Sequence, residues 1–365
     1  MTEALTSAET VDAGSAPILW YTRCPVPTAS GIAHARGWLA ETAANAGLEL
    51  RVLQDAAPEV AVRHFDHALP GLIREGGNVP ALAARASGSS TRVIGLTWID
   101  EAQAILVRPD SPIAVAADLR GARLAVPAWA VDRARSFPRA MALHGYLNAL
   151  RVGGLDLADA RLVEIPTEPA PQVRGASRAT TTWGIDALLA GDVDAVYVKG
   201  ARAQDVALAH GLRAAVDLDT TTRREDRVNN GTPRPITVHQ SLLDTQPEVV
   251  VDFLVRSLRA ADWAAHHPDE ARAVLASETG SASAGAAAAY PDRVIADLRP
   301  SLTVERIDLL RRQQQFLLAH GFLDADFDID TWVDSEPLSH AQEIVALERV
   351  DADDLQHEGK GGGAR

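Results

Sequence analysis

The stretch TRVIGLTWIDEAQAILVRPDSPIAVAADLRGARLAVP, residues 91–127, decides the fold class. It holds two apolar runs close together, Thr91–Trp98 and Gln103–Arg108, and each has the length and β-branched content of a strand. A short helix start, a glycine turn and a third strand-like run follow over Asp118–Pro127. Strands separated by turns and helical segments indicate an α/β chain with a parallel-rich sheet.

The same alternation continues on both sides of this stretch. Ala16–Tyr21 and Leu48–Leu53 are typical of strands, and a helix is predicted between them over Gly31–Ala46, where apolar residues recur three to four positions apart. Helical sequence runs from Ala134 to Arg151, and the chain after Pro247 is mostly helical. The sequence therefore predicts a mixed α/β fold along its whole length.

The order of these segments predicts two lobes with a ligand cleft between them. We expect residues 17–108 and 236–350 to form the first lobe and residues 109–235 to form the second. Residues 1–16 are predicted to be a disordered leader and residues 351–365 a flexible tail. Because α/β folds bind ligands outside the carboxyl ends of their strands, the site is expected where the lobes face each other.

The composition is that of a globular protein with an acidic balance. The chain is 47% hydrophobic and its formal net charge is −14, which argues against nucleic acid and anionic membrane partners. It has no run of about 18 apolar residues, and its first residues lack the basic and apolar regions of a secretory signal. We therefore expect a cytoplasmic protein, and a monomer, because no exposed apolar helix face stands out.

Cys24 is the only cysteine of the chain and lies in YTRCPVPTAS, residues 21–30. It follows a predicted strand, and Pro25 and Pro27 stiffen the loop after it, so the thiol would be well placed at a strand end. One cysteine cannot form an internal disulfide, which agrees with a reducing compartment. A free cysteine is also commonly a small buried hydrophobe, so a chemical role and a packing role both stay open.

A second candidate segment is VRHFDHALPGLIREGGNVP, residues 62–80. Gly76 and Gly77 enter a predicted helix, and backbone N–H groups in such a loop suit an anion. Arg74 would add a planar fork for two oxygens of a sulfinate, sulfonate or carboxylate. A plain turn at the glycines, and a surface ion pair of Arg74 with a neighbouring carboxylate, are the simpler interpretations.

His64 lies ten positions before Arg74 and could orient a thiol or tune its proton. His67 is an equal candidate by spacing, and a purely structural role is open for both histidines. No third or fourth ligand has suitable spacing, so we expect no metal. The chain also has no Walker loop, no dinucleotide fingerprint, no G-x-S-x-G elbow and no C-x-x-C pair.

These motifs resemble the desulfinase family of bacterial dibenzothiophene desulfurisation. The residues that carry the resemblance are YTRCPVP, HFDHALPGLIREGGNVP, the stretch 92–126, GDVDAVY (Gly191–Tyr197) and LLRRQQQFLLAHGFL (Leu309–Leu323). They span most of the chain from Ile18 to Trp332. DLRGARLAV and GDVDAVY are shared with periplasmic sulfonate- and nitrate-type binding proteins, so these two pieces bear on the fold alone.

The resemblance implies a type II periplasmic-binding-protein-like fold. It implies an enzyme that hydrolyses an aryl sulfinate to a 2-hydroxybiphenyl-type product and sulfite, with neither metal nor organic cofactor. It also implies roles for single residues. Cys24 matches the essential cysteine of the family, and His64 and Arg74 match a histidine and an arginine of its site. Cys24 would then either protonate the ring carbon that bears sulfur or attack sulfur as a thiolate.

The resemblance also implies a set of substrate-binding residues. Thr22 stands where the family has a serine and keeps its hydroxyl, and Gly77, next to Gly76, matches a glycine whose N–H faces the sulfinate. Phe137 falls where the family has a tryptophan near the substrate rings, and Arg74 would hold the sulfinate. The main alternative is a sulfonate- or anion-binding protein of the ABC-transporter type without catalysis. A thiamine-precursor pyrimidine synthase on the same fold would need a cysteine-rich iron site, which one cysteine disfavours.

Overall fold

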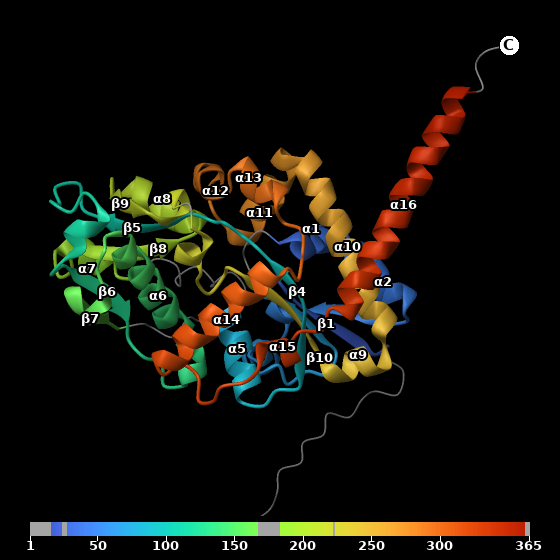
Figure 1. Ribbon diagram of the computed structural model, residues 1–365, viewed down its shortest axis with the longest axis horizontal. Coiled ribbons are helices and arrows are strands. Elements are labelled where there is room, and N and C mark those ends of the chain that lie inside the picture. The colour runs from blue at the N-terminus through green and yellow to red at the C-terminus, as the bar shows by residue number, and fades with distance from the viewer. Residues whose placement is uncertain (1–15, 24–27, 167–182, 222, 362–365) are drawn as a thin grey trace, which may run out of the picture.

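The computed structural model describes residues 16–23, 28–166, 183–221 and 223–361, and their strands form two five-stranded sheets, one in each lobe (Figure 1). The first sheet has the order β2-β1-β3-β10-β4 and consists of β1 (Ile18–Arg23), β2 (Glu49–Val52), β3 (Leu72–Glu75), β4 (Thr91–Thr97) and β10 (Arg234–His239). The second has the order β7-β6-β8-β5-β9 and consists of β5 (Gln103–Val107), β6 (Arg123–Pro127), β7 (Arg161–Ile165), β8 (Ala195–Lys199) and β9 (Arg213–Asp217).

In the first sheet, β1 runs parallel to both β2 and β3, whereas β10 enters antiparallel between β3 and β4. Neighbouring side chains of a strand point to opposite faces of the sheet, and helices cover both faces. Val93 of β4 packs with α5 (Asn78–Ala86) and α14 (Val304–Ala319), and Ile94 packs with α1 (Ala29–Ala35) and α10 (Pro247–His266). The carboxyl ends of β1 and β3 therefore lie at one edge of a covered sheet.

The second sheet is covered in the same way. Ile105 of β5 packs in one core with Tyr146 of α6 (Phe137–Val152). Its neighbour Leu106 packs on the opposite face with α7 (Ile185–Ala190) and α8 (Ala201–Ala209). A further core joins the lobes, since it contains apolar residues of α5, α6 and α14.

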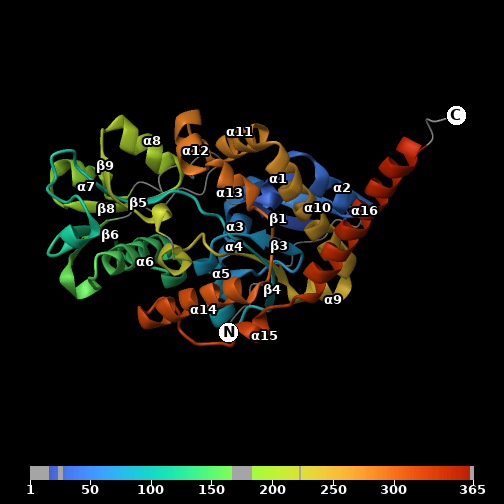
Figure 2. The same ribbon diagram turned by 45° about the horizontal axis from the view of Figure 1, so that its top comes forward.

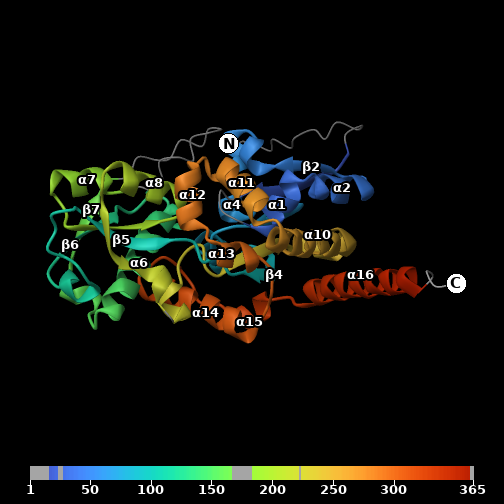
Figure 3. The ribbon, with the colours of Figure 1, turned by 90° about the horizontal axis from the view of Figure 1, so that it is seen from above.

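The chain passes between the two sheets twice, at residues 98–102 and 218–233. The ion pair of Asp100 with Arg227 joins the two crossings, and Glu101 of the first crossing pairs with Lys199 of β8. The remaining helices after β10 are α9 (Gln240–Thr245), α11 (Pro268–Thr279), α12 (Ser283–Ala289), α13 (Asp292–Ala296), α15 (Ile329–Trp332) and α16 (Glu336–Gly361). Figures 2 and 3 show the lobes side by side and the far end of α16 extending away from both. Among the described residues, no helix has the length and apolarity needed to span a membrane.

Several expectations need correction. The predicted strand at 103–108 exists as β5, but it lies in the second sheet, so the chain leaves the first lobe before residue 103 and not after 108. The single helix predicted over Gly31–Ala46 is two helices, α1 and α2 (Trp38–Asn45), because Gly37 between them adopts a φ of 80°. The helix α16 runs to Gly361, so residues 351–361 of the predicted tail are helical, and their flexibility stays a prediction. The leader prediction falls almost wholly on residues outside the described ranges.

Candidate functional site

The candidate site is built at the carboxyl ends of β1 and β3. Thr22 and Arg74 are partners in the register of these parallel strands, and Arg23 is the partner of Glu75. Cys24 directly follows Arg23 in the chain and lies outside the described residues. In a parallel sheet this edge is where ligands bind, so the site predicted from the sequence falls at the expected end of the strands.

Arg74 is buried, with 2% of its surface exposed, so the surface ion pair considered from the sequence is wrong. Its Nη2 donates to the backbone oxygen of Gly77 at 3.0 Å, and its guanidinium lies directly over Gly76. A Cβ atom at Gly76 would lie 2.6 Å from the Arg74 Cζ. Gly76 is therefore needed for the arginine to fold back over its own loop.

Asn230 lies at the N-terminus of α5. Most of the backbone N–H groups that were predicted to be free there donate hydrogen bonds. The backbone oxygen of Asn230 accepts from the Asn78 N–H at 2.6 Å, and its Oδ1 accepts from the Val79 N–H at 3.0 Å. The Gly76 N–H donates to a backbone oxygen of β10 at 3.3 Å. Within the described residues, the Gly77 N–H donates to no group, which leaves it as the backbone donor at this turn.

His64 lies in α4 (Arg63–Asp66), and its Nδ1 donates to the Ala61 backbone oxygen at 2.8 Å. Burial lowers the pKa of His64 to about 4, against the opposing effect of that hydrogen bond, and the positive charges of Arg74 and Arg135 lower it further. His64 is therefore neutral near pH 7, with its proton on Nδ1. Its Nε2 keeps a lone pair that can accept a hydrogen bond from a thiol.

His67 is brought to the same place and is buried, with a φ of 55°. Burial holds its pKa well below the usual range, and the charge of Arg74 adds to the effect. Its Nε2 is buried and has no hydrogen-bond partner among the described residues. The structure thus places both histidines in the field of Arg74, as candidates for the role beside the thiol.

The second lobe contributes an aromatic ring and a cation. Phe137, at the start of α6, lies 6.2 Å from the ring of Phe65, whose ring in turn lies 3.8 Å from that of His64. The Arg135 guanidinium lies 5.4 Å from the Phe65 ring. Phe137 is thus part of an aromatic row that connects the second lobe to His64, whereas Arg135 is a cation that the sequence analysis did not single out.

Glu75 is a further buried group that the sequence analysis missed. It accepts hydrogen bonds from the hydroxyls of Ser30 and Thr97, the latter at 2.5 Å. The Tyr21 hydroxyl in turn lies 2.7 Å from the Ser30 Oγ. Burial raises the pKa of Glu75. These contacts tie the ends of β1, β3 and β4 to the first turn of α1, and so fix both ends of the loop that contains Cys24.

Together these residues can bind an anion. Arg74 supplies charge, Gly77 supplies an N–H, and the Thr22 hydroxyl is buried without a hydrogen-bond partner among the described residues. Neutral His64 can accept a proton or a hydrogen bond, and Phe137 can contact an apolar body. In the described ranges, no group of three or more His, Cys, Asp or Glu side chains is placed to hold a metal ion.

The strand order, with β10 inserted antiparallel between β3 and β4, and the anion-binding edge define a type II periplasmic-binding-protein-like fold. The aliphatic sulphonate binding protein SsuA of Escherichia coli shares this fold at 16% identity, with a TM-score of 0.63 over 88% of this chain and 92% of SsuA. The NMT1/THI5-like family model matches residues 178–271. The fold prediction is confirmed.

The relatives of higher identity are more specific. The 2'-hydroxybiphenyl-2-sulfinate desulfinases of Rhodococcus erythropolis and Rhodococcus qingshengii are each 31% identical to this chain, over 91% of it and 95% of the relative. The crystal structure of the desulfurization enzyme DSZB matches with a TM-score of 0.74 and 27% identity, over 90% of this chain and 99% of DSZB. A cysteine-to-serine variant of DSZB in complex with biphenyl-2-sulfinic acid matches with a TM-score of 0.70. The chain belongs to the 2'-hydroxybiphenyl-2-sulfinate desulfinase family.

Proposed function

We propose that the protein is an aryl sulfinate desulfinase that hydrolyses the C–S bond of 2'-hydroxybiphenyl-2-sulfinate, or of a related aryl sulfinate, to the 2-hydroxybiphenyl-type product and sulfite. One observation carries the proposal. Arg74 is buried and folded over Gly76 at the end of β3, in register with the end of β1 from which Cys24 follows. The family to which the chain belongs supplies the substrate class.

The described residues account for substrate binding. Two sulfinate oxygens would sit on the Arg74 guanidinium and the Gly77 N–H, where a charged planar donor and a backbone donor converge. The Thr22 hydroxyl, buried beside Arg74 in the strand register, would donate a third hydrogen bond. Phe137 would contact the aryl rings from the second lobe.

In the first catalytic route, Cys24 acts as a general acid. Its S–H proton is transferred to the ring carbon that bears sulfur, and the C–S electron pair returns to the ring as sulfur dioxide leaves. Hydration of sulfur dioxide gives hydrogen sulfite and a proton, and the thiolate regains a proton. The Nε2 of neutral His64 would orient the thiol before the transfer.

In the second route, the Cys24 thiolate attacks sulfur. The aryl group leaves with the C–S electron pair and takes up a proton, and water then releases hydrogen sulfite from the cysteine and restores the thiol. The two routes are separable by experiment. A linear proton inventory with a solvent deuterium effect supports the first route, and trapping of a Cys24–sulfur adduct supports the second.

The alternative function is an anion-binding protein without catalysis. Its basis is the fold alone, which the chain shares with SsuA over 88% of its length at 16% identity. The alternative predicts tight binding of sulfonates and sulfinates alike, with no bond cleavage. The desulfinase proposal predicts turnover of sulfinates with release of sulfite. Hydrolysis of the C–S bond of a sulfonate would release sulfate instead.

The test is sulfite release from 2'-hydroxybiphenyl-2-sulfinate, followed together with formation of 2-hydroxybiphenyl by chromatography. We expect the two products in equal amounts from the sulfinate and none from biphenyl-2-sulfonate. Binding of both compounds without product would support the binding-protein alternative. Within the same proposal we place the protein in the cytoplasm as a monomer, to be checked by cell fractionation and by light scattering.

A further inference from the structure

A cavity of about 430 Å³ lies between α6 and α14, among residues to which the proposed function gives no role. Arg151 and His144 line it from α6, and Arg311, Arg312 and Phe316 line it from α14. α6 belongs to the second lobe, and α14 packs against α5 of the first lobe. The cavity therefore lies between elements that pack on different sheets.

The positive charges of this cavity are incompletely balanced. Asp308 lines the cavity but is paired with Arg311, which also binds Asp330 at 2.8 Å. Arg151 and Arg312 are exposed, and neither guanidinium forms an ion pair or a hydrogen bond with any residue in the described part of the chain. Two guanidinium groups thus reach one cavity without a carboxylate to neutralise them.

The walls of the cavity are fixed. His144 is buried, its Nδ1 lies 2.6 Å from the Gln313 Oε1, and its ring stacks on Phe316 at 4.1 Å between centroids. Burial lowers the pKa of His144 to about 3, and Arg151 and Arg312 contribute to the shift. The charges of both arginines therefore reach His144 in the wall of the cavity, and an anion bound in the cavity would lie close to the same wall.

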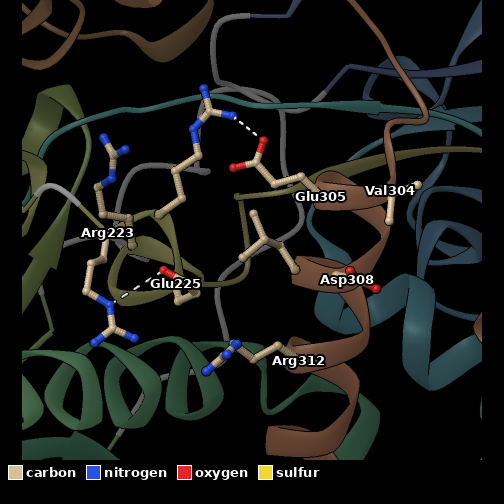
Figure 4. Close-up of a pocket in the computed structure, with 9 residues that line it drawn as sticks. Arg223, Glu225, Val304, Glu305, Asp308 and Arg312 are labelled. Atoms are coloured by element: carbon tan, nitrogen blue, oxygen red, sulfur yellow. Dashed lines mark hydrogen bonds and ion pairs between the residues drawn. The ribbon is translucent and has the colours of Figure 1, made fainter.

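The neighbouring larger cavity, of about 790 Å³, provides a contrast (Figure 4). Two of its arginines are matched by carboxylates that also line it, with Arg224 at 3.0 Å from Glu305 and Arg223 at 3.7 Å from Glu225. Arg312 lines both cavities, and Figure 4 shows it on α14 below Asp308. The smaller cavity therefore differs in being lined by two arginines that are unpaired among the described residues, Arg151 and Arg312.

We propose that the cavity between α6 and α14 binds a small tetrahedral oxyanion, of the sulfate or phosphate type, between Arg151 and Arg312. Each guanidinium presents several N–H donors in a fork that suits two oxygens of such an anion. The volume leaves room for water on the remaining oxygens. Because the arginines come from two helices, the anion joins α6 to α14. The proposal does not depend on the proposed function.

The test is equilibrium dialysis with labelled sulfate, alongside thermal unfolding in sulfate, in phosphate and in sodium chloride at matched ionic strength. We expect one sulfate per chain, competition by phosphate, and a higher melting temperature in either oxyanion than in chloride. Arg151→Gln and Arg312→Gln should each weaken binding about tenfold or more. Arg161→Gln removes an exposed arginine of β7 that lies outside the cavity and should leave binding unchanged.

A second readout uses His320, which also lines the cavity and whose pKa is lowered by burial and by the charge of Arg151. Oxyanion binding should raise this pKa in wild-type protein, measured by NMR titration, and not in the Arg151→Gln/Arg312→Gln double variant. Equal binding by that double variant and wild type would overturn the proposal. So would a thermal response to sulfate no larger than the response to chloride.

Discussion

Thr22 and Arg74 face each other in the register of two neighbouring parallel strands. The pairing places the buried guanidinium of Arg74 at the strand end where the chain continues into Cys24. Thr22 and Arg74 are 52 positions apart in the sequence, so the sheet alone brings them together.

Arg74→Lys should lower kcat/KM for the aryl sulfinate about 100-fold while the fold is kept. Lysine retains the charge but lacks the planar fork that binds Gly77 and would bind two sulfinate oxygens. Steady-state kinetics and circular dichroism provide the check. Arg51→Lys, an exposed site on β2 paired with Glu49, is the matched control. Unchanged KM in Arg74→Lys would show that the arginine does not hold the substrate.

Gly76→Ala should displace the Arg74 guanidinium, because the new Cβ would lie 2.6 Å from its Cζ. We expect KM to rise at least tenfold, with a smaller effect on the melting temperature. Gly47→Ala provides the comparison, since Gly47 has a φ of 71° and open space around it. That variant should lose about 1 kcal/mol of stability from backbone strain and keep its KM. The reverse pattern would refute the role given to Gly76.

His64 predicts an acid sensitivity with a defined sign. Its pKa is lowered to about 4 in the folded protein, so between the ordinary value of 6.5 and about 4 the unfolded chain binds a proton that the folded chain does not. The free energy of unfolding should therefore fall as the pH falls through this window. His64→Gln should flatten that slope, measured by urea unfolding at several pH values, and the exposed His340→Gln should not.

Ser30→Ala should destabilise the protein by about 1–3 kcal/mol, because it removes a donor from the buried Glu75 carboxyl and a partner from the Tyr21 hydroxyl. Urea unfolding measures the change. Ser89→Ala, which removes an exposed hydrogen bond to the Asp66 backbone oxygen, should cost less than about 0.5 kcal/mol. Equal effects of the two substitutions would contradict the buried network around Glu75.

Much of the fold was predictable from periodicity. Strands such as β1 and β4 are continuous apolar runs, and glycine turns separate them from helices. β3 and β10 were missed for a physical reason. β3 is the four-residue segment LIRE, and two of its four residues are charged, while β10 begins with Arg234 and Pro235. Both strands are buried despite these residues, because they lie inside a sheet that other elements cover, which no local pattern reveals.

The candidate site could be predicted only as far as its residues lie in one segment of the sequence. His64, Arg74 and Gly77 belong to residues 62–80, and the structure groups them. Asn230 could not be predicted, because the whole second lobe separates it from Gly77 along the chain although the two residues are in contact. Glu75 was missed for a similar reason, since its donors Ser30 and Thr97 come from α1 and β4.

The most direct measurement is single-turnover sulfite release by wild type and by Cys24→Ser, with sulfinate binding followed in parallel by calorimetry. Serine keeps the size of the side chain but is a far weaker acid and nucleophile. The account predicts release by wild type, loss of at least about 1,000-fold in Cys24→Ser, and binding of the sulfinate by both proteins within about threefold. Release by Cys24→Ser at the wild-type rate would contradict it.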